Sequence, residues 1–516
     1  MILKNKKRRL SVPRFLLVLA ILVAGVFGLR TYGADMAAEL APGKKEASDR
    51  KPWFASYVDA TLTPQYQFEQ YEDNVVLSFV VAKSNTKEAS WGNAYSLKQA
   101  SEDLDLDRRI ARLRQNGKDV IVSFGGLLND ELALVYDNAD DLAAAYQQVI
   151  DAYQLSTIDL DLENDGLTDC EAGKRRAEAI AKLQKDNKNQ LAVWLTLPVI
   201  PQGLTKDGTD TVAEMLAAGV DLAGVNLMTM NFGQARDDKK SMAENAIDAL
   251  KQTHRQLKIL YREADIHLSD GAVWQKLGAT PMIGQNDISQ ELFTLEDAAV
   301  LNEFAVEVGL GRVSMWSANR DLSSNKNNVN TGVVSNHASG VKQDGQAFAA
   351  ALREGMDGDI AASAKGKTVS DVKEGESDAA DDPKTSPYEI WQETKSYLKD
   401  TKVVWRHNVY RAKWWTKGDA PDSPVLQESE IPWELVGPVL EGEKPVKLAT
   451  LPPGTYPEWN PEEVYDSGKR IMYNGIAYES KWWNQNENPE RSGVDDDLIP
   501  WRALSQQEIK KILKQK

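Results

Sequence analysis

Between about residues 50 and 325, short runs rich in β-branched residues alternate with longer charged stretches that have the apolar period of a helix. Eight alternations in about 300 residues predict a (β/α)8 barrel, here assigned to residues 51–363. In that fold, functional residues lie where strands end and the following loops begin. The helix-like stretches include Leu104–Gln115, Gly173–Asp186 and Lys240–Leu257. The strand candidates are Phe54–Asp59, Val75–Val81, Asp119–Phe124, Thr157–Glu163, Leu191–Leu197, Gly224–Met230, Thr280–Ile283 and Arg312–Trp316.

The fourth strand candidate carries three carboxylates at alternate positions, Asp159, Asp161 and Glu163, with Leu160 and Leu162 between them. Residues two apart in a strand point the same way, so the acids line one face and the aliphatic residues the other. Like charges about 7 Å apart along a strand repel, and an inward-facing stripe forces one carboxyl to keep its proton. A general acid working near neutral pH needs such a proton. The alternative is an amphipathic strand whose acids lie in water.

The chain has 516 residues, a formal net charge of −16 and 42% hydrophobic residues, which suggests about two to four domains with real cores. The acidic balance argues against a nucleic-acid partner, because phosphate binding needs a basic surface, and fits a neutral ligand. The single cysteine, Cys170, excludes an intrachain disulfide. The four histidines are scattered without metal-ligand spacing, so we expect neither a metal nor a cofactor.

Residues 1–34 have the composition of an export signal. Five Lys or Arg residues among the first nine are followed by an apolar run from Phe15 to Leu29. This run is short for a membrane span, which needs about 20 residues. We therefore predict a signal peptide cleaved near Ala34, with an uncleaved signal anchor as the alternative. In either case the rest of the chain is expected to be secreted or held outside the membrane.

The C-terminal part of the chain differs from the barrel. Residues 364–386 are rich in Lys, Ser, Gly, Asp and Ala, which predicts a flexible linker. Nine of the 14 tryptophans follow residue 390, where the sequence repeats at a constant offset of 68 residues. We interpret this part as two copies of a small aromatic-rich module, at residues 387–437 and 455–505. The matched pairs are Trp391/Trp459, Tyr397/Tyr465, Tyr410/Tyr478, Lys413/Lys481, Trp414/Trp482, Trp415/Trp483, Pro421/Pro489, Pro432/Pro500 and Trp433/Trp501.

Four motifs in the barrel resemble those of glycoside hydrolase family 18, the chitinases. Ser156–Glu163 resembles the family's D-G-x-D-x-D-x-E, with Ser156 and Thr157 in place of the first Asp and the Gly. The resemblance covers about residues 51 to 350 and implies a (β/α)8 barrel that hydrolyses β-1,4 bonds between N-acetylglucosamine units. The other motifs are Ser123-Phe124-Gly125-Gly126 for S-x-G-G on the third strand, Val225–Asn231 for M-x-Y-D on the sixth and Ser314–Trp316 for the eighth-strand Trp. Thr280–Asp287 resembles the corresponding segment in a subgroup of the family's chitinases from archaea and actinobacteria.

The resemblance also implies a role for each acid. Glu163 would protonate the glycosidic oxygen, and Asp161 would orient the substrate's N-acetyl group and stabilise an oxazolinium ion. Asp159 would share a proton with Asp161. No second nucleophilic carboxylate is needed, because the family is one of the substrate-assisted exceptions among glycosidases. The residues expected to line the sugar site are Tyr57, Ser123, Gly125, Gly126, Met228, Met230, Asn231, Gln285, Asn286, Asp287 and Trp316, the last as the floor under the sugar.

Two residues depart from the sixth-strand motif. Met230 stands where the family has Tyr, and its side chain cannot donate a hydrogen bond to the acetamido oxygen. Asn231 stands where the family has Asp, which removes a negative charge beside the acid. With one fewer negative neighbour, the pKa of Glu163 should be raised less, so we expect a lower or narrower working pH range.

The repeated modules resemble carbohydrate-binding families 5 and 12. Ala412–Thr416 and Ser480–Asn484 are similar to their A-K-W-W-T core. Exposed aromatic faces stack on pyranose rings, whereas a module this small also needs aromatic residues for its core, so we expect about half of them in each role. The residues in question are Tyr410, Trp414, Trp415, Trp433, Tyr478, Trp482, Trp483 and Trp501.

The sequence therefore predicts a secreted, monomeric chitinase held to chitin, or to another N-acetylglucosamine polysaccharide, by two binding modules. One alternative is a chitin-binding lectin or adhesin with an inactive barrel. The presence of Glu163 argues against it, since such relatives typically lack the catalytic Glu. The other alternative is an endo-β-N-acetylglucosaminidase that acts on glycoproteins.

Overall fold

The computed structural model describes residues 51–188, 190–324, 334–361, 368–371, 381–406, 408–421, 426–427, 430–439, 443–446, 449–490 and 499–515. The predicted signal segment lies outside these residues, as does part of the predicted linker. Within the described residues, no helix is both long enough and apolar enough to cross a membrane.

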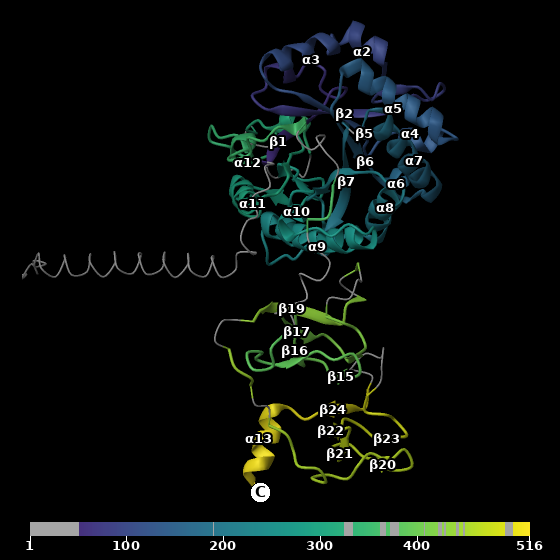
Figure 1. Cartoon of the computed structure of the whole chain (residues 1–516). Coiled ribbons are helices and arrows are strands. Elements are labelled where there is room, and N and C mark those ends of the chain that lie inside the picture. The colour runs from purple at the N-terminus through teal and green to yellow at the C-terminus, as the bar shows by residue number, and fades with distance from the viewer. Residues whose placement is uncertain are drawn as a thin grey trace, which may run out of the picture. The chain divides into compact units, whose positions relative to one another are not determined.

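Eight parallel strands form a closed barrel (Figure 1). Each strand pairs in parallel with its two neighbours, and the pairing of β1 with both β2 and β13 closes the cylinder. The predicted barrel is thus confirmed. The strands are β1 (Trp53–Asp59), β2 (Asn74–Ala82), β5 (Val120–Gly125), β6 (Thr157–Asp161), β7 (Ala192–Ile200), β9 (Leu222–Met228), β10 (Leu277–Thr280) and β13 (Arg312–Val313).

For the first six strands, most observed ends lie within about two residues of the predicted ends. The seventh strand is shifted, and the eighth, β13, ends at Val313 instead of Trp316. The seventh strand, predicted at Thr280–Ile283, is β10 at Leu277–Thr280. Its Gly278 and Ala279 carry little strand signal, yet a β-carbon at Gly278 would lie 2.9 Å from the Asn226 side chain. Close packing in the barrel, rather than local propensity, therefore sets this strand.

Helices surround the barrel, and capping residues fix where several of them begin (Figure 1). Ser241 accepts from the backbone N–H of Glu244, and the Glu244 side chain accepts from the Ser241 N–H, which is a capping box at the start of α9. The barrel helices are α2 (Leu97–Asp103), α3 (Leu106–Gln115), α4 (Leu132–Val135), α5 (Ala139–Tyr153), α6 (Asn164–Thr168), α7 (Cys170–Asp186), α8 (Lys206–Ala217), α9 (Met242–Glu263), α10 (Asp270–Trp274), α11 (Leu295–Val308) and α12 (Phe348–Leu352). The last helix, α13 (Gln506–Gln515), packs on the second C-terminal module. Short 3-10 turns lie at Phe68–Gln70, Gly233–Ala235 and Ala318–Arg320.

Alternation along the strands divides the barrel into two apolar regions. On β1, Phe54 and Val58 pack outward into the large core beneath the helices, whereas Trp53 and Tyr57 pack in the barrel interior. On β6, Ile158 and Leu160 belong to the outer core. The residues between them, including Asp159, therefore face the barrel axis.

A buried ion pair joins α7 to the loop after β5. Arg176 donates from Nε and Nη2 to Glu131 Oε2 (3.1 Å each), and both side chains are buried. Arg176 Nη2 also donates to the Gly166 carbonyl (2.6 Å) at α6. Tyr146 on α5 donates to the other Glu131 oxygen. The pair therefore connects three elements beneath the carboxyl end of β6.

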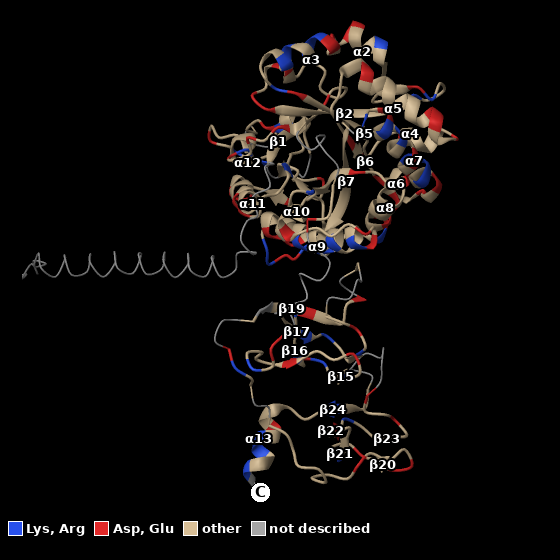
Figure 2. Ribbon diagram, viewed as in Figure 1, with Lys and Arg blue, Asp and Glu red and all other residues tan. Residues whose placement is uncertain are grey.

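Charges on the outside of the barrel are mixed. Figure 2 shows Lys and Arg interspersed with Asp and Glu along outer helices such as α3 and α9. Exposed ion pairs of this kind contribute little to stability.

Five of the six strands of the first C-terminal module recur in the second at the predicted offset of 68 residues, and β14 corresponds there to the isolated bridge between Glu458 and Met472. In each module the ring pair Tyr397–Trp433 or Tyr465–Trp501 is packed edge to face, with centroids 5.3 and 5.0 Å apart. The repeat is therefore confirmed as a structural repeat. The strands are β14 (Glu389–Ile390), β15 (Ser396–Tyr397), β16 (Lys402–Trp405), β17 (Asn408–Ala412), β18 (Thr416–Lys417) and β19 (Trp433–Pro438), then β20 (Val464–Tyr465), β21 (Arg470–Tyr473), β22 (Ile476–Ser480), β23 (Asn484–Gln485) and β24 (Trp501–Ala503).

Five short strands lie outside the eight barrel strands. β3 (Ala89–Trp91) and β4 (Tyr95–Ser96) extend the sheet from β2, β8 (Gly203–Leu204) pairs with β7, and β11 (Gly284–Gln285) and β12 (Leu292–Phe293) pair with each other.

Candidate active site

The three acids of the predicted stripe lie at the carboxyl end of β6. Asp159 and Asp161 belong to the strand, and Glu163 follows it in extended conformation (φ −130°, ψ 161°) just before α6. Strand pairing continues past Asp161, because the Leu162 N–H donates to the Thr196 carbonyl (3.0 Å). Since Leu160 and Leu162 pack in the outer core, the acids point toward the barrel axis, as predicted.

Asp159 lies deepest and is completely buried. Its Oδ2 accepts from Ser123 Oγ (2.7 Å) and Tyr57 OH (2.9 Å). Its Oδ1 accepts from Thr196 Oγ1 (2.7 Å) and Arg312 Nη1 (2.6 Å). Tyr57 and Ser123, which we expected near the sugar, thus serve this carboxylate in the barrel interior.

Thr196 and Arg312 were missed as site residues by the sequence analysis. One sequence signal could have revealed Arg312. It is a charged residue at the start of an otherwise apolar strand candidate. A buried arginine without a counter-charge is very unfavourable, so its presence in a strand implies an acid facing it.

Asp161 is buried one layer above, and its Oδ1 has no hydrogen-bond partner within the described residues. Burial raises the pKa of this carboxyl well above its usual value, and the charges of Glu163 and Asp159 raise it further, while Arg312 opposes them. Asp161 is therefore a carboxyl that holds a proton readily and offers an unused oxygen to a ligand.

Two glycines let the neighbouring loop pass close to Asp161. Gly125 has a φ of +99°, and a β-carbon there would lie 2.1 Å from the Asp161 carbonyl oxygen. Gly126 has a φ of +85°, and its N–H donates to that same oxygen (2.9 Å). A side chain at Gly125 would therefore push the loop away from the acids.

Glu163 is half-buried at the barrel mouth. Burial raises the pKa of its carboxyl to about 7, and the negative charge of Asp287 contributes to the shift. Asp287 is held by Asn231, whose Nδ2 donates to Asp287 Oδ2 (2.8 Å) and whose Oδ1 accepts from the Asp287 N–H (3.0 Å). The charge that Asn231 lacks is thus supplied by Asp287 through the loop after β10, which the sequence analysis did not anticipate.

We expect Asp287→Asn to move the basic limb of the kcat/KM profile to lower pH by about half to one unit. A general acid must be protonated, so activity falls as pH rises through the pKa of Glu163, and removing a negative neighbour lowers that pKa. The asparagine can still accept the Asn231 hydrogen bond. The control is Asp238→Asn, which removes an exposed carboxylate from the loop that contains Asn231. An equal shift of the basic limb in this control would mean that the effect comes from general surface charge.

Other predicted sugar-lining residues divide into a half-buried and a buried group. Trp316 is half-buried, with its ring stacked on Phe79 (centroids 5.6 Å apart), and Met228 and Met230 are also half-buried. Gln285 and Asn286 are buried, and their amide nitrogens donate to carbonyls of their own loop. Gln285 and Asn286 therefore stabilise the loop that carries Asp287. For Trp316, Met228 and Met230, contact with the sugar stays a prediction.

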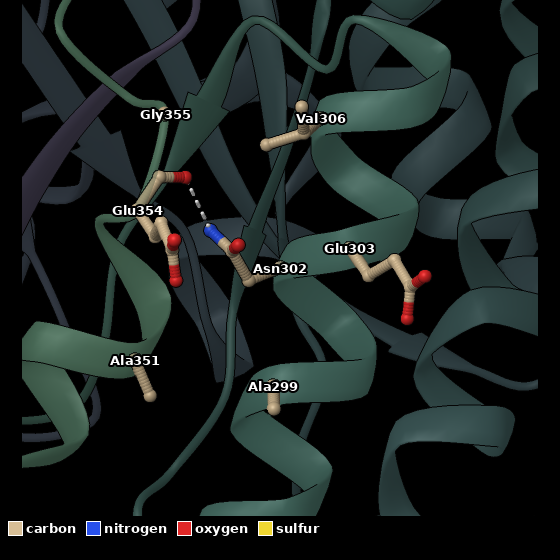
Figure 3. A pocket seen from close by; sticks show the side chains of 7 residues that line it. All are labelled: Ala299, Asn302, Glu303, Val306, Ala351, Glu354 and Gly355. Carbon is tan, nitrogen blue, oxygen red and sulfur yellow. Dashed lines mark hydrogen bonds between the residues drawn. The ribbon is translucent and has the colours of Figure 1, made fainter.

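A polar cavity of about 180 Å³ adjoins the acids. Its walls include the last two acids of the stripe and the loops after β5 and β6, namely Gly126, Asn129, Glu131, Asp161, Glu163 and Asn164. A second cavity, of about 420 Å³, lies between α11 and the end of α12 (Figure 3). There Asn302 Nδ2 donates to the Glu354 carbonyl (3.0 Å), and the lining residues include none from the barrel strands. The acidic strand is therefore the stronger candidate for chemistry.

The aromatic residues of the modules also divide into two groups. Trp433, Tyr478 and Trp501 are buried in the module cores. Trp482 and Trp483 are 41% and 61% exposed, whereas Trp414, Trp415 and Tyr410 in the first module are half-buried. The expectation of both core and surface aromatic residues is thus met by the geometry of the second module.

Several known proteins with related sequences are chitinases. The chain is 36% identical over 301 residues to a probable bifunctional chitinase/lysozyme of Escherichia coli K12, and 35% identical over 301 residues to endochitinase 11 of Metarhizium anisopliae. These matches cover 54% of this chain, but only 33% and 56% of the two relatives. The chain therefore spans about a third of one relative and just over half of the other.

A comparison of folds also relates this chain to chitinases. The catalytic domain of a hyperthermophilic chitinase from Pyrococcus furiosus superposes with a TM-score of 0.51 and 29% identity, covering 60% of this chain and 95% of that domain. By sequence and by fold, the chain is homologous to chitinases, which are glycoside hydrolases. Residues 458–502 match the model of carbohydrate-binding module family 5/12, which identifies the second module.

Proposed function

We propose that this protein is a chitinase that hydrolyses β-1,4 bonds between N-acetylglucosamine units, with Glu163 as general acid and base. The observation that carries the proposal is the position of Glu163 at the mouth of the barrel, where burial and Asp287 raise its pKa to about 7. A carboxyl with this pKa is protonated in a useful fraction near neutral pH. Homology to chitinases supports the choice of substrate.

In the first step, Glu163 donates its proton to the glycosidic oxygen while the C1–O bond breaks. The acetamido carbonyl oxygen of the same sugar forms a bond to C1, which gives an oxazolinium ion and releases the leaving chain. The unused Oδ1 of Asp161 is available to the acetamido N–H, and this contact would hold the carbonyl oxygen against C1. The polymer supplies its own nucleophile.

In the second step, the Glu163 carboxylate accepts a proton from water as the water oxygen attacks C1 and opens the oxazolinium ring. Attack from the face that the leaving group occupied restores the original anomeric configuration, so the mechanism retains configuration. Trp316, stacked on Phe79 and half-buried, offers a ring face to the sugar undergoing these steps.

The two modules would hold the barrel on insoluble substrate. Exposed aromatic faces such as Trp482 and Trp483 suit the apolar faces of pyranose rings, and tethering raises the effective concentration of the barrel at the surface. We extend the proposal to export, which is supported by the basic and apolar composition of residues 1–34.

We expect the double change Trp482→Ala and Trp483→Ala to weaken binding to insoluble chitin by roughly tenfold, because two stacking faces are lost. Hydrolysis of soluble chito-oligosaccharides should stay at the wild-type rate, since the barrel is unchanged. Binding isotherms on chitin and rates on the soluble substrate measure the two effects. Val464→Ala, an exposed apolar residue of the same module, should leave both unchanged. A wild-type isotherm for the double variant would mean that the second module binds through another face.

The direct test is incubation of the purified protein with colloidal chitin, with reducing ends and soluble oligosaccharides as the readout. Release of chito-oligosaccharides supports the proposal. Peptidoglycan and glycoproteins bearing N-acetylglucosamine are assayed in parallel, and exclusive activity on one of them would transfer the proposal to that polymer. Binding without release from any of these substrates would indicate a lectin with an inactive barrel.

A further inference from the structure

The loop after β9 turns three consecutive backbone N–H groups toward side chains of the loop after β10. The Asn231 N–H donates to Asn286 Oδ1 (3.3 Å). The next two N–H groups, of Phe232 and Gly233, donate to the two carboxylate oxygens of Glu291 (3.1 and 2.7 Å). We call this set of contacts the loop clasp. It joins the loops that follow two neighbouring barrel strands, because β9 and β10 are paired.

The backbone conformation explains why these N–H groups converge. Asn231 has a φ of +52°, in the left-handed region that asparagine tolerates, and Phe232 is right-handed helical (φ −66°, ψ −23°). Successive residues of opposite hand point their N–H groups into one concavity that binds an anion. The Glu291 carboxylate occupies this concavity and is 1% exposed. A buried carboxylate needs hydrogen bonds in place of its hydration, so Glu291 and the loop after β9 fix each other.

The loop clasp also sets the place of Asp287, which lies between Asn286 and Glu291 in the chain. Asn231 donates to its side chain (2.8 Å) and accepts from its N–H (3.0 Å). The Asp287 side chain is exposed, and its negative charge acts on Glu163. Water screens an exposed charge steeply with distance. The effect of Asp287 on Glu163 therefore depends on how closely the clasp holds this loop.

The other charged groups around Glu163 lie outside the loop clasp. Arg320 interacts electrostatically with Asp287 and donates from Nη2 to the Gln285 carbonyl (2.8 Å), so it supports the loop after β10 independently of Glu291. A change at Glu291 therefore reaches Glu163 through Asp287. The carboxylates on the remaining sides of Glu163 are Asp161 on β6 and Asp130, Glu131 and Asp165 along the polar cavity.

We propose that Glu291 is a positioning residue of the active site, whose carboxylate fixes the loop after β9 and so holds Asp287 beside the acid Glu163. The inference rests on the proposed function and goes beyond it, because Glu291 lies outside the sequence motifs of the barrel and contacts the backbone of a residue 59 positions earlier in the chain. Loss of the clasp should leave the barrel folded but let Asp287 move away from Glu163.

The first test follows the protonation of Glu163 directly and needs no substrate. Carbon-13 NMR of protein labelled at the glutamate carboxyl carbons is recorded against pH, and the signal that Glu163→Gln removes identifies the acid. In the wild type this signal should titrate with a pKa of about 7. In Glu291→Asp, which keeps the charge but is too short to reach both N–H groups, the pKa of Glu163 should fall by about half a unit. Glu291→Gln, which loses one acceptor oxygen, should lower it similarly.

A double-mutant cycle separates the position of Asp287 from the charge of Glu291. Asp287→Asn alone should lower the pKa of Glu163, and adding Glu291→Gln should lower it no further, because the charge that the clasp positions is already gone. Full additivity of the two shifts would mean that Glu291 acts through its own charge, which overturns the proposal. The matched control is Glu296→Gln, at an exposed glutamate in the first turn of α11, and it should leave the pKa of Glu163 unchanged.

An unchanged pKa of Glu163 in both Glu291 variants would also overturn the proposal, as would a wild type in which no glutamate titrates near neutral pH. Where one of the two variants does not fold, the other decides by the same titration. The basic limb of the kcat/KM profile on a soluble chito-oligosaccharide should move to lower pH by the same amount. The NMR titration reads the same whether or not chitin is cleaved, so these shifts without hydrolysis would refute the proposed function and leave this inference standing.

Discussion

Glu163→Gln is expected to lower kcat on chito-oligosaccharides by about 1,000-fold, because glutamine cannot donate the proton that the leaving oxygen needs. Glutamine has nearly the same size, and Glu163 forms no ion pair with any described residue, so folding should be unaffected. Binding to insoluble chitin should persist, since the modules are intact. Initial rates and binding isotherms on the same preparation measure both effects.

The matched control is Glu171→Gln, the same chemical change at an exposed position eight residues later, which should leave kcat unchanged. A Glu163→Gln variant that retains more than a tenth of the wild-type kcat would transfer the acid role to another carboxyl, with Asp161 the first to examine.

The largest effect on stability is expected for Arg176→Met, which should lower the free energy of unfolding by about 3–5 kcal/mol. The change leaves Glu131 buried without its cation, and it removes the hydrogen bond to the Gly166 carbonyl at α6. Calorimetry that resolves the unfolding of the barrel measures the loss. Because α6 directly follows Glu163, a loss of activity at temperatures below unfolding should accompany it.

Two further variants show whether the loss comes from the buried pair. Adding Glu131→Gln to Arg176→Met removes the unpaired charge of Glu131 and should recover part of the lost stability. Lys174→Met on the same helix breaks an exposed pair with Glu171 and should not change the melting temperature measurably. Equal destabilisation by Lys174→Met would mean that α7 is sensitive to any change of charge rather than to the buried pair.

Much of the fold could be predicted because its signals are local. The acids of the stripe alternate within one short strand, and Gly125 and Gly126 stand next to each other where the backbone needs positive φ. The module repeat was readable for the same reason, since aromatic residues recur in register without a gap. These features depend on neighbours in the sequence.

The partners of the acids could not be predicted because barrel closure creates them. Tyr57 and Arg312 lie 102 and 153 residues from Asp159 in the chain and meet it only across the closed barrel. Asp287 likewise lies in the loop after β10, 56 residues along the chain from Asn231, the motif position that it compensates. The strand β10 was placed three residues too late because Gly278 is selected by close packing and not by strand propensity.

The pairing of Asn231 with Asp287 has a consequence for finding enzymes of this kind in genomes. A search that demands an aspartate at the end of the sixth strand would discard this chain as defective, although a carboxylate still accompanies the acid. Relatives that moved this charge from one loop to another would be lost in the same way, and their number would be underestimated. Scoring which carboxylates surround the acid in space, instead of which letter occupies a column, would retain them.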